Sequence, residues 1–273
     1  MSLTNSINTN VSASLALEQL NQTRTDLAST QLSVTTGLRV SGPQDDASSF
    51  AIALNLKGTI AGDTAVQTAL STGESTVNVA VSAGQSIADL LVQAKAKIVQ
   101  ANQAGLDTNS RTALHNDFAA LRSQIDTIVA TASFNGTNLL SSGASTLTVL
   151  STADGSTIAV SAQNLSTTQL AISASDLTTS AGAATALTAI NSAITTVSNA
   201  LAALGSSVSR IQNQSTFTGK LIDTLNAGVG NLVDADLAQE SAKLQALQIK
   251  QQLGVQALSI ANQSPQSLLA LFR

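Results

Sequence analysis

Proline occurs at only two positions in this 273-residue sequence, Pro43 and Pro265. The 221 residues between them contain none, so every residue there keeps the backbone N–H that a helix uses. Over much of this region apolar residues recur at spacings of three and four, which is the period of an amphipathic helix. These features predict a mainly α chain with long helices.

Both ends of the chain carry coiled-coil-like apolar stripes. Over residues 3–35 the stripe repeats every seven residues, at Ala13, Leu20, Leu27 and Val34. A last helix is predicted over residues 233–262 with two stripes, one of them containing Leu253, so neighbours are expected on more than one side. The simplest arrangement pairs the two ends as a long antiparallel helical hairpin that a β insertion closes at its far end.

The interior of the chain predicts three more helices, over about residues 45–102, 107–134 and 183–230. Asp45 and Asp46 stand at the start of the first, where carboxylates are favoured by the helix dipole. Four glycines within it leave open whether it runs straight or bends. The second ends at Phe134-Asn135-Gly136, because Asn-Gly is a strong turn signal.

Residues 141–180 follow a different pattern. Polar and apolar residues alternate over 146–150, 157–160 and 169–172, which predicts short strands, and Asp154-Gly155 predicts a hairpin turn between the first two. We therefore expect a small β insertion in a segment otherwise rich in Ser, Thr and Ala.

Composition excludes several classes of function. The chain has no Cys, so disulfide scaffolds and Cys-ligated zinc are excluded, and His115 alone cannot build a multi-histidine metal site. A net charge of −4 with no Trp or Tyr argues against nucleic-acid binding. The sequence contains no run of 18 apolar residues, so no membrane span is expected. It also contains no nucleophile–base constellation, so an enzyme is not expected. We expect no cofactor and no metal.

Two features at the C-terminal end call for partners. Asp234, Asp236 and Glu240 cluster at the start of the last predicted helix, where capping and subunit contact are the expected roles, because no loop with calcium-ligand spacing is present. The chain then ends on apolar residues, whereas chain ends are normally polar. These residues are Leu268, Leu269, Leu271 and Phe272.

The same segments resemble bacterial flagellins, and more narrowly the short flagellins of alphaproteobacteria. The resemblance runs colinearly over about residues 1–140 and 185–273. The matching segments are Ile7-Asn-Thr-Asn10, Thr36-Gly-Leu-Arg39-Val, Asp45-Asp46-Ala47, Ala51-Ile52-Ala53, Phe134-Asn-Gly136-Thr-Asn-Leu139-Leu140, Leu204-Gly205, Val233-Asp234-Ala-Asp236-Leu-Ala-Gln-Glu240-Ser, Gln251-Gln252 and Ala261-Asn262-Gln263-Ser-Pro265-Gln.

The resemblance implies a domain organisation. An inner coiled coil (D0) would comprise residues 1–42 with 232–273, and a helical bundle (D1) residues 43–140 with 182–231. A β insertion over 141–181 would cap D1, with no outer D2 or D3 domains, because only about 45 residues separate the matching halves. The residues expected to serve subunit contact and assembly are Leu20, Leu27, Val34, Arg39, Asp45, Asp46, Asn135, Asp234, Asp236, Glu240, Leu253, Leu268, Leu269, Leu271 and Phe272.

The implied function is that of a structural subunit, which polymerises into the helical flagellar filament used for swimming. The implied partners are further copies of the chain, related flagellins, the flagellar export apparatus, a secretion chaperone, the filament cap and hook-junction proteins. The implied location is extracellular, after export without a cleaved signal peptide. Two alternatives stay open: a hook–filament junction protein and a secreted coiled-coil adhesin. Ser86 and Ala88 stand where receptor-activating flagellins carry basic residues, so weak activation of the innate immune receptor is expected.

Overall fold

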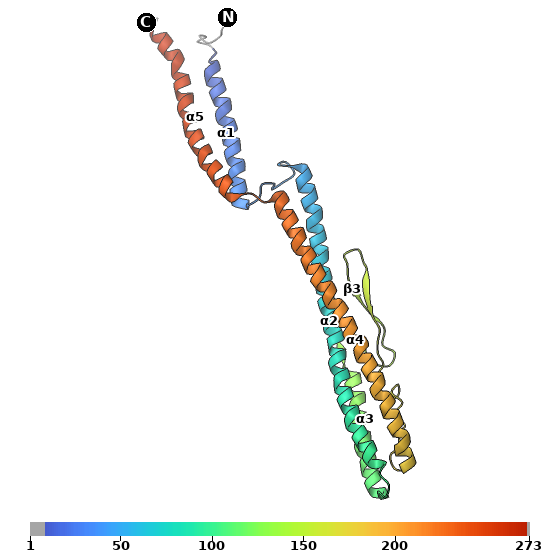
Figure 1. The fold of residues 1–273 in the computed structure, drawn as a ribbon. Coiled ribbons are helices and arrows are strands. Elements are labelled where there is room, and N and C mark those ends of the chain that lie inside the picture. Colours follow the sequence, from blue (N-terminus) through green and yellow to red (C-terminus); the bar gives the residue numbers. More distant parts are fainter. Residues whose placement is uncertain (1–8, 272–273) are drawn as a thin grey trace. The chain divides into compact units, whose positions relative to one another are not determined.

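The computed structural model describes residues 9–271, with side chains described for residues 9–263. This part of the chain is mainly helical, as predicted (Figure 1). The helices are α1 (Val11–Thr36), α2 (Ala47–Ala101), α3 (Thr108–Thr131), α4 (Ser180–Val233) and α5 (Leu237–Leu271). The strands are β1 (Ser133–Phe134), β2 (Thr137–Asn138), β3 (Leu147–Leu150) and β4 (Thr157–Val160).

The chain divides into two compact units. Unit 1 consists of Met1–Gly58 with Thr224–Arg273, and unit 2 consists of Thr59–Asp223. Unit 1 therefore combines the two ends of the sequence, whereas unit 2 is one continuous segment.

In unit 1 the two terminal helices, α1 and α5, lie side by side and run antiparallel (Figure 1). At one end of the pair, the Asn10 side chain donates from Nδ2 to the carbonyl of Ala261 at 2.8 Å. Asn10 also caps α1 by accepting from the N–H of Ala13. At the other end, Leu38 and Asp234 form an antiparallel bridge. The predicted pairing of the two chain ends is confirmed.

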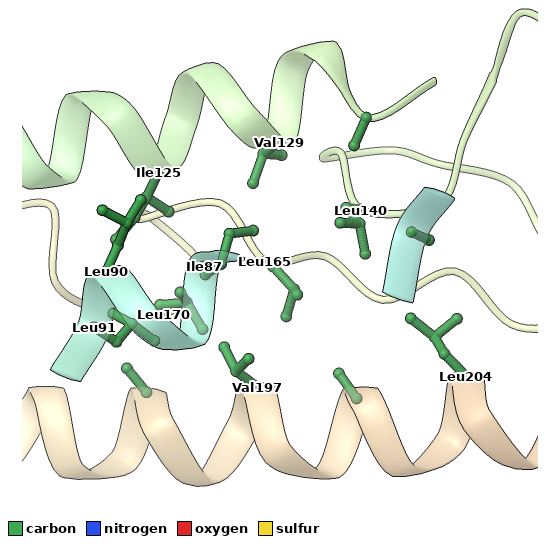
Figure 2. Close-up of a cluster of buried hydrophobic side chains, with 14 of the residues drawn as sticks. Ile87, Leu90, Leu91, Ile125, Val129, Leu140, Leu165, Leu170, Val197 and Leu204 are labelled. Carbon is green, nitrogen blue, oxygen red and sulfur yellow. The ribbon is translucent and has the colours of Figure 1, made fainter. Parts of the chain in front are cut away.

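Unit 2 contains the main hydrophobic core (Figure 2). Its apolar side chains come from α2, α3, α4, the β3–β4 hairpin, the segment that follows β2 and the irregular segment that leads from β4 to α4. The labelled members are Ile87, Leu90, Leu91, Ile125, Val129, Leu140, Leu165, Leu170, Val197 and Leu204. Full burial of one such side chain contributes about 1.5–3 kcal/mol, so this unit has ample apolar burial to fold around.

The β3–β4 hairpin lies along the side of α2 and α4. The β insertion was expected at the far end of the paired helices, and that prediction is wrong. Its register pairs Val149 with Ile158, and its turn contains Gly155 at φ +94°. Val149 packs onto α2 at Gly73, where a Cβ atom would lie only 2.5 Å from Val149 Cγ2. Gln214 of α4 donates to the carbonyl of Ser151 at 2.8 Å. Because Gly73 has no side chain, the hairpin can lie directly against this side of α2.

The third predicted strand, over residues 169–172, does not form. The N–H groups of Leu170 and Ile172 donate to the nearby carbonyls of Ser166 and Thr167, and Ala171 takes φ +56°. Leu170 and Ile172 are nevertheless both buried. The alternation correctly marked which residues enter the core, but local turns satisfy the backbone in place of a third strand.

Two helices run beyond their predicted ends. The helix expected to stop at residues 228–230 continues to Val233, and α5 continues past residue 262 through Pro265 to Leu271. A glycine inside a helix costs only about 1 kcal/mol, and the buried Val229 and Val233 hold the last turn of α4 in place. Among the described helices, α4 is also long and apolar enough to pass a length-and-composition test for a membrane span. Core helices pass the same test, and α4 supplies Val197 and Leu204 to the core of unit 2.

Candidate assembly surface and chain joint

The segment after α1 is bonded to the segment between α4 and α5, and we call these two segments (residues 37–40 and 232–235) the chain joint. The N–H groups of Arg39 and Val40 donate to the carbonyl of Val233 at 2.7 and 3.2 Å, and the N–H of Ala235 donates to Gly37 at 2.9 Å. Gly37 takes φ +72°, which closes α1 with a left-handed turn. The joint brings together parts of the chain about two hundred residues apart in sequence.

The side chain of Arg39 adds to this joint. Its Nη2 donates to the carbonyl of Leu232 at 2.6 Å, in the last turn of α4. The last carbonyls of a helix have no partner within it, and a cation there also interacts favourably with the helix dipole. Arg39 therefore acts within the chain, as a cap for α4.

Asp45 and Asp46 order the segment that leads into α2. Asp45 Oδ2 accepts from the N–H and hydroxyl of Ser41 and from the N–H of Gly42, at 2.8–3.1 Å. Asp46 caps α2 by accepting from the hydroxyl of Ser49 and the N–H groups of Ser48 and Ser49. These hydrogen bonds lower the pKa of both carboxyl groups, with the Ser41 hydroxyl the largest cause for Asp45 and the Ser49 hydroxyl for Asp46.

The acidic cluster at the start of α5 divides into separate roles. Asp236 caps α5 by accepting from the N–H groups of Ala238 and Gln239. Glu240 lies in the first turn and pairs with Lys243 at 3.7 Å, while Asp234 joins the bridge to Leu38. Among the described residues, no group of three or more His, Cys, Asp or Glu side chains could hold a metal ion. The cluster is built for helix capping and for the chain joint.

The predicted stripe of α1 is only partly buried against α5. Leu20 is buried, and it lies 3.2 Å from the point where a Cβ atom would stand on Gly254 of α5. Leu27 and Val34 are half-buried. Two threonines, Thr23 and Thr30, are buried on the same side. The α1–α5 contact is thus a narrow and partly polar seam.

Large apolar side chains are left exposed on the rest of both terminal helices, and we call this set the assembly surface. Leu253, predicted from its stripe, is 58% exposed. Ile249 and Ile260 lie four and seven residues away on the same helix face. The members are Val11, Leu15, Leu17 and Leu32 on α1 and Leu237, Ile249, Leu253, Val255 and Ile260 on α5. Periodicity marked some of these residues as apolar stripes, but it could not tell which side would face α5.

Of the remaining predicted site residues, Asn135 is the one with a described side chain. Asn135, at φ +47°, forms with Gly136 the two-residue turn between β1 and β2 in unit 2, so its place is fixed by turn geometry. The side chains of Leu268, Leu269 and Leu271 belong to the undescribed part of α5, and Phe272 lies outside the described residues.

A shallow groove of about 490 Å³ runs between α2 and β3 in unit 2. It is lined by small or apolar residues, by threonines and by Asn135, and none of its lining side chains carries a charge. The groove therefore offers no acid–base pair of the kind that general acid–base catalysis requires.

Comparison with known sequences decides the family. The chain matches the profile for the bacterial flagellin N-terminal helical region over residues 7–146 and that for the bacterial flagellin C-terminal helical region over residues 187–272. The chain belongs to the bacterial flagellin family. It is a structural subunit of the extracellular flagellar filament, and flagellin chains assemble with one another.

Individual relatives agree over the whole chain. Flagellin FljK of Caulobacter vibrioides is 46% identical over 270 residues, covering 98% of this chain and 99% of the relative. A flagellin of Brucella melitensis is 38% identical over 281 residues, covering 98% and 99%. These relatives are alphaproteobacterial flagellins of similar short length, which confirms the resemblance described above.

Among solved structures, a putative flagellar hook-associated protein from Vibrio parahaemolyticus is similar, with a TM-score of 0.59 and 14% identity. The match covers 70% of this chain and 100% of that chain. Identity this low shows a shared fold alone. The junction-protein and adhesin alternatives are no better supported than the filament subunit.

Proposed function

We propose that this flagellin polymerises mainly through the assembly surface of α1 and α5. The observation that carries the proposal is the contrast between the two units: large apolar side chains are mostly buried in unit 2 but mostly exposed on the terminal helices. Large apolar side chains that are exposed together along one helix face, as at Ile249, Leu253 and Ile260, mark a site of protein contact. Further copies of the chain would cover this surface, in a contact between different faces that repeats into an open filament.

The energetic basis is apolar burial offset by the cost of ordering. Each large side chain that leaves water contributes about 1.5–3 kcal/mol. The narrow α1–α5 seam stabilises these helices little by itself, so we expect them to become fully ordered only when neighbouring subunits cover them. Charged residues make up 10% of the chain, so the filament should depend little on salt.

The proposal assigns two roles within D0 and D1. The expected D0, residues 1–42 with 232–273, would carry the assembly surface. Arg39, Asp45, Asp46, Asp234 and Asp236 would act indirectly, by fixing the chain joint and the helix starts from which α1 and α5 extend.

Export and partners follow from family membership as further proposals. The chain would leave the cell through the flagellar export apparatus, with no cleaved signal peptide and with a secretion chaperone masking its apolar end. It would then meet the filament cap, hook-junction proteins and related flagellins. We propose no enzymatic activity, and weak activation of the innate immune receptor because exposed Ser86 and half-buried Ala88 supply no positive charge.

Seeded polymerisation tests the proposal. Filaments would be depolymerised by heat, returned to neutral pH with filament fragments and imaged by electron microscopy, for the full chain and for a chain lacking residues 264–273. The expected result is uniform filaments from the full chain and none from the truncated chain. A full chain that stays monomeric on active seeds would favour the junction-protein or adhesin alternatives.

A further inference from the structure

Three side chains on one face of α3 hold the irregular segment that leads from β4 to α4. Asp126 accepts from the N–H and hydroxyl of Thr167, at 3.0 and 2.7 Å. Arg122 donates to the carbonyls of Ile172 and Ser173. The N–H of Leu177 donates to Nδ1 of His115 at 3.3 Å. Positions 115, 122 and 126 are spaced by seven and four, so they share a helix face.

The contact at His115 fixes the start of α4. Leu177 is fully buried, and Thr179 caps α4 by accepting from the N–H of Gly182 at its hydroxyl and from that of Ala183 at its carbonyl. Asp176 shapes the turn between them by accepting from the N–H and hydroxyl of Thr178, both at 2.9 Å. The hydrogen bond to His115 thus anchors the short lead-in, residues 176–179. The first turn of α4, a helix of 54 residues, depends on the conformation of this lead-in.

Nδ1 of His115 has two competing partners. It accepts from Leu177, and it lies 3.4 Å from Oδ1 of Asp176. A neutral imidazole with its proton on Nε2 can accept at Nδ1, whereas a protonated imidazole donates from both nitrogens. The first state suits the Leu177 N–H, and the second suits the Asp176 carboxylate. One atom therefore cannot serve both partners in the same protonation state.

The other charged groups near this face are already engaged. Arg111, one turn before His115, donates to the carbonyls of Ala101 and Gln103. Asp117 pairs with Lys97 at 2.8 Å. Arg122 is held on Ile172 and Ser173 and lies over the Phe118 ring. Among the described interactions, Asp176 is the charged partner of His115.

We propose that His115 is a proton-sensitive latch on the lead-in to α4, which holds the backbone of Leu177 when neutral and exchanges it for the carboxylate of Asp176 when protonated. His is the side chain whose charge ordinarily changes between pH 5 and 8, and His115 is the only His in the chain. Acid would therefore release one of the three attachment points on α3 and leave the contacts of Asp126 and Arg122 in place.

Hydrogen exchange of the full-length monomer, followed by mass spectrometry at pH 7.5 and 5.5, tests the latch. After correction for the intrinsic pH dependence of exchange, peptides covering residues 174–183 should exchange on the order of fivefold faster at pH 5.5, the effect of losing one hydrogen bond. Peptides covering the Thr167 contact should not change. The chain's one imidazole signal in 15N-histidine NMR reports protonation directly.

Matched variants separate the latch from a general effect of acid. His115→Asn keeps a side-chain acceptor that does not titrate, so protection should persist at both pH values. His115→Leu removes the acceptor, so exchange should be fast at both. Asp176→Asn keeps an oxygen for Thr178 but removes the charge that favours the imidazolium, so release should move to lower pH. Protection that is unchanged while the imidazole titrates, or a pH response that survives in His115→Asn, would overturn the proposal.

Discussion

The Arg39 guanidinium donates to the carbonyl of Leu232 at 2.6 Å and so ties the end of α1 to the last turn of α4. Backbone bonds between Arg39 and Val233 and between Ala235 and Gly37 complete the chain joint. The two segments that leave unit 1's terminal helices are therefore bonded to each other. This joint lies where α1 ends and α5 begins, the two helices that carry the assembly surface.

Arg39→Gln should loosen the chain joint. The substitution removes the cation at the C-terminus of α4, and we expect a loss of about 1 kcal/mol of local stability, because the site is exposed. Hydrogen exchange of residues 232–236 in the monomer measures the change. Arg210→Gln on the exposed side of α4 removes the same charge outside the joint, and equal exchange in both variants would contradict the assigned role.

Gly73→Ala should destabilise unit 2, although alanine is the better helix former. The added methyl group would lie 2.5 Å from Val149 Cγ2, and overpacking of this kind costs about 1–3 kcal/mol. Gly205→Ala, on α4 with nothing within 4 Å of the new Cβ, should instead gain up to about 1 kcal/mol. Urea unfolding of the monomers distinguishes the two. Adding Val149→Ala should relieve the defect of Gly73→Ala.

Acid should weaken the start of α2. The folded-state pKa of Asp46 is lowered, chiefly by the Ser49 hydroxyl, so its carboxylate contributes stability that is present above the ordinary carboxyl pKa of 3.8. That contribution is lost as pH falls below 3.8 and through the lowered pKa. Hydrogen exchange of residues 46–50 between pH 6 and 2.5 should show it. Asp46→Asn, which still caps, should flatten the pH response of this segment.

Alanine substitutions at Leu20 and Leu15 should distinguish an effect on the folding of the monomer from an effect on assembly. Leu20 is 3% exposed and Leu15 is 66% exposed on the same helix. Leu20→Ala should weaken the narrow α1–α5 seam, so the helix content of the monomer and the extent of polymerisation should both fall. Leu15→Ala should leave the monomer nearly unchanged and still raise the critical concentration for seeded growth. Circular dichroism of the monomer and light scattering of seeded solutions measure the two effects, and normal growth of Leu15→Ala would count against the assembly surface.

Local sequence signals predicted most of the fold. The three- and four-residue spacing gave the helices because one apolar stripe per helix faces a core, and Asp107 before Thr108 marked the start of α3 that its side chain caps. Asp154-Gly155 marked the β3–β4 turn because glycine takes the positive φ found there. These features depend on a few neighbouring residues, so the sequence alone is enough to reveal them.

What depends on distant partners was not predictable. Nothing near Gly73 in sequence indicates that Val149 will occupy the space above it. The stripe through Leu20 also contains Leu27 and Val34, but only the partner helix decides that Thr23 is buried and Leu15 is not. Arg39 was expected at a subunit contact, and its bond to Leu232 spans 193 positions in the chain.

The accessibility of a cysteine introduced at position 253 tests most directly the claim that subunits assemble through the surface of α1 and α5. The chain contains no cysteine of its own, so the introduced thiol is the one that reacts. Single-cysteine variants Leu253→Cys and Ser156→Cys, the latter on the exposed turn of the β3–β4 hairpin, would be treated with a maleimide as monomers and as filaments. We predict that both react as monomers, and that in filaments position 253 is protected while position 156 still reacts. Equal labelling of position 253 in monomers and filaments would contradict assembly through the α1–α5 surface.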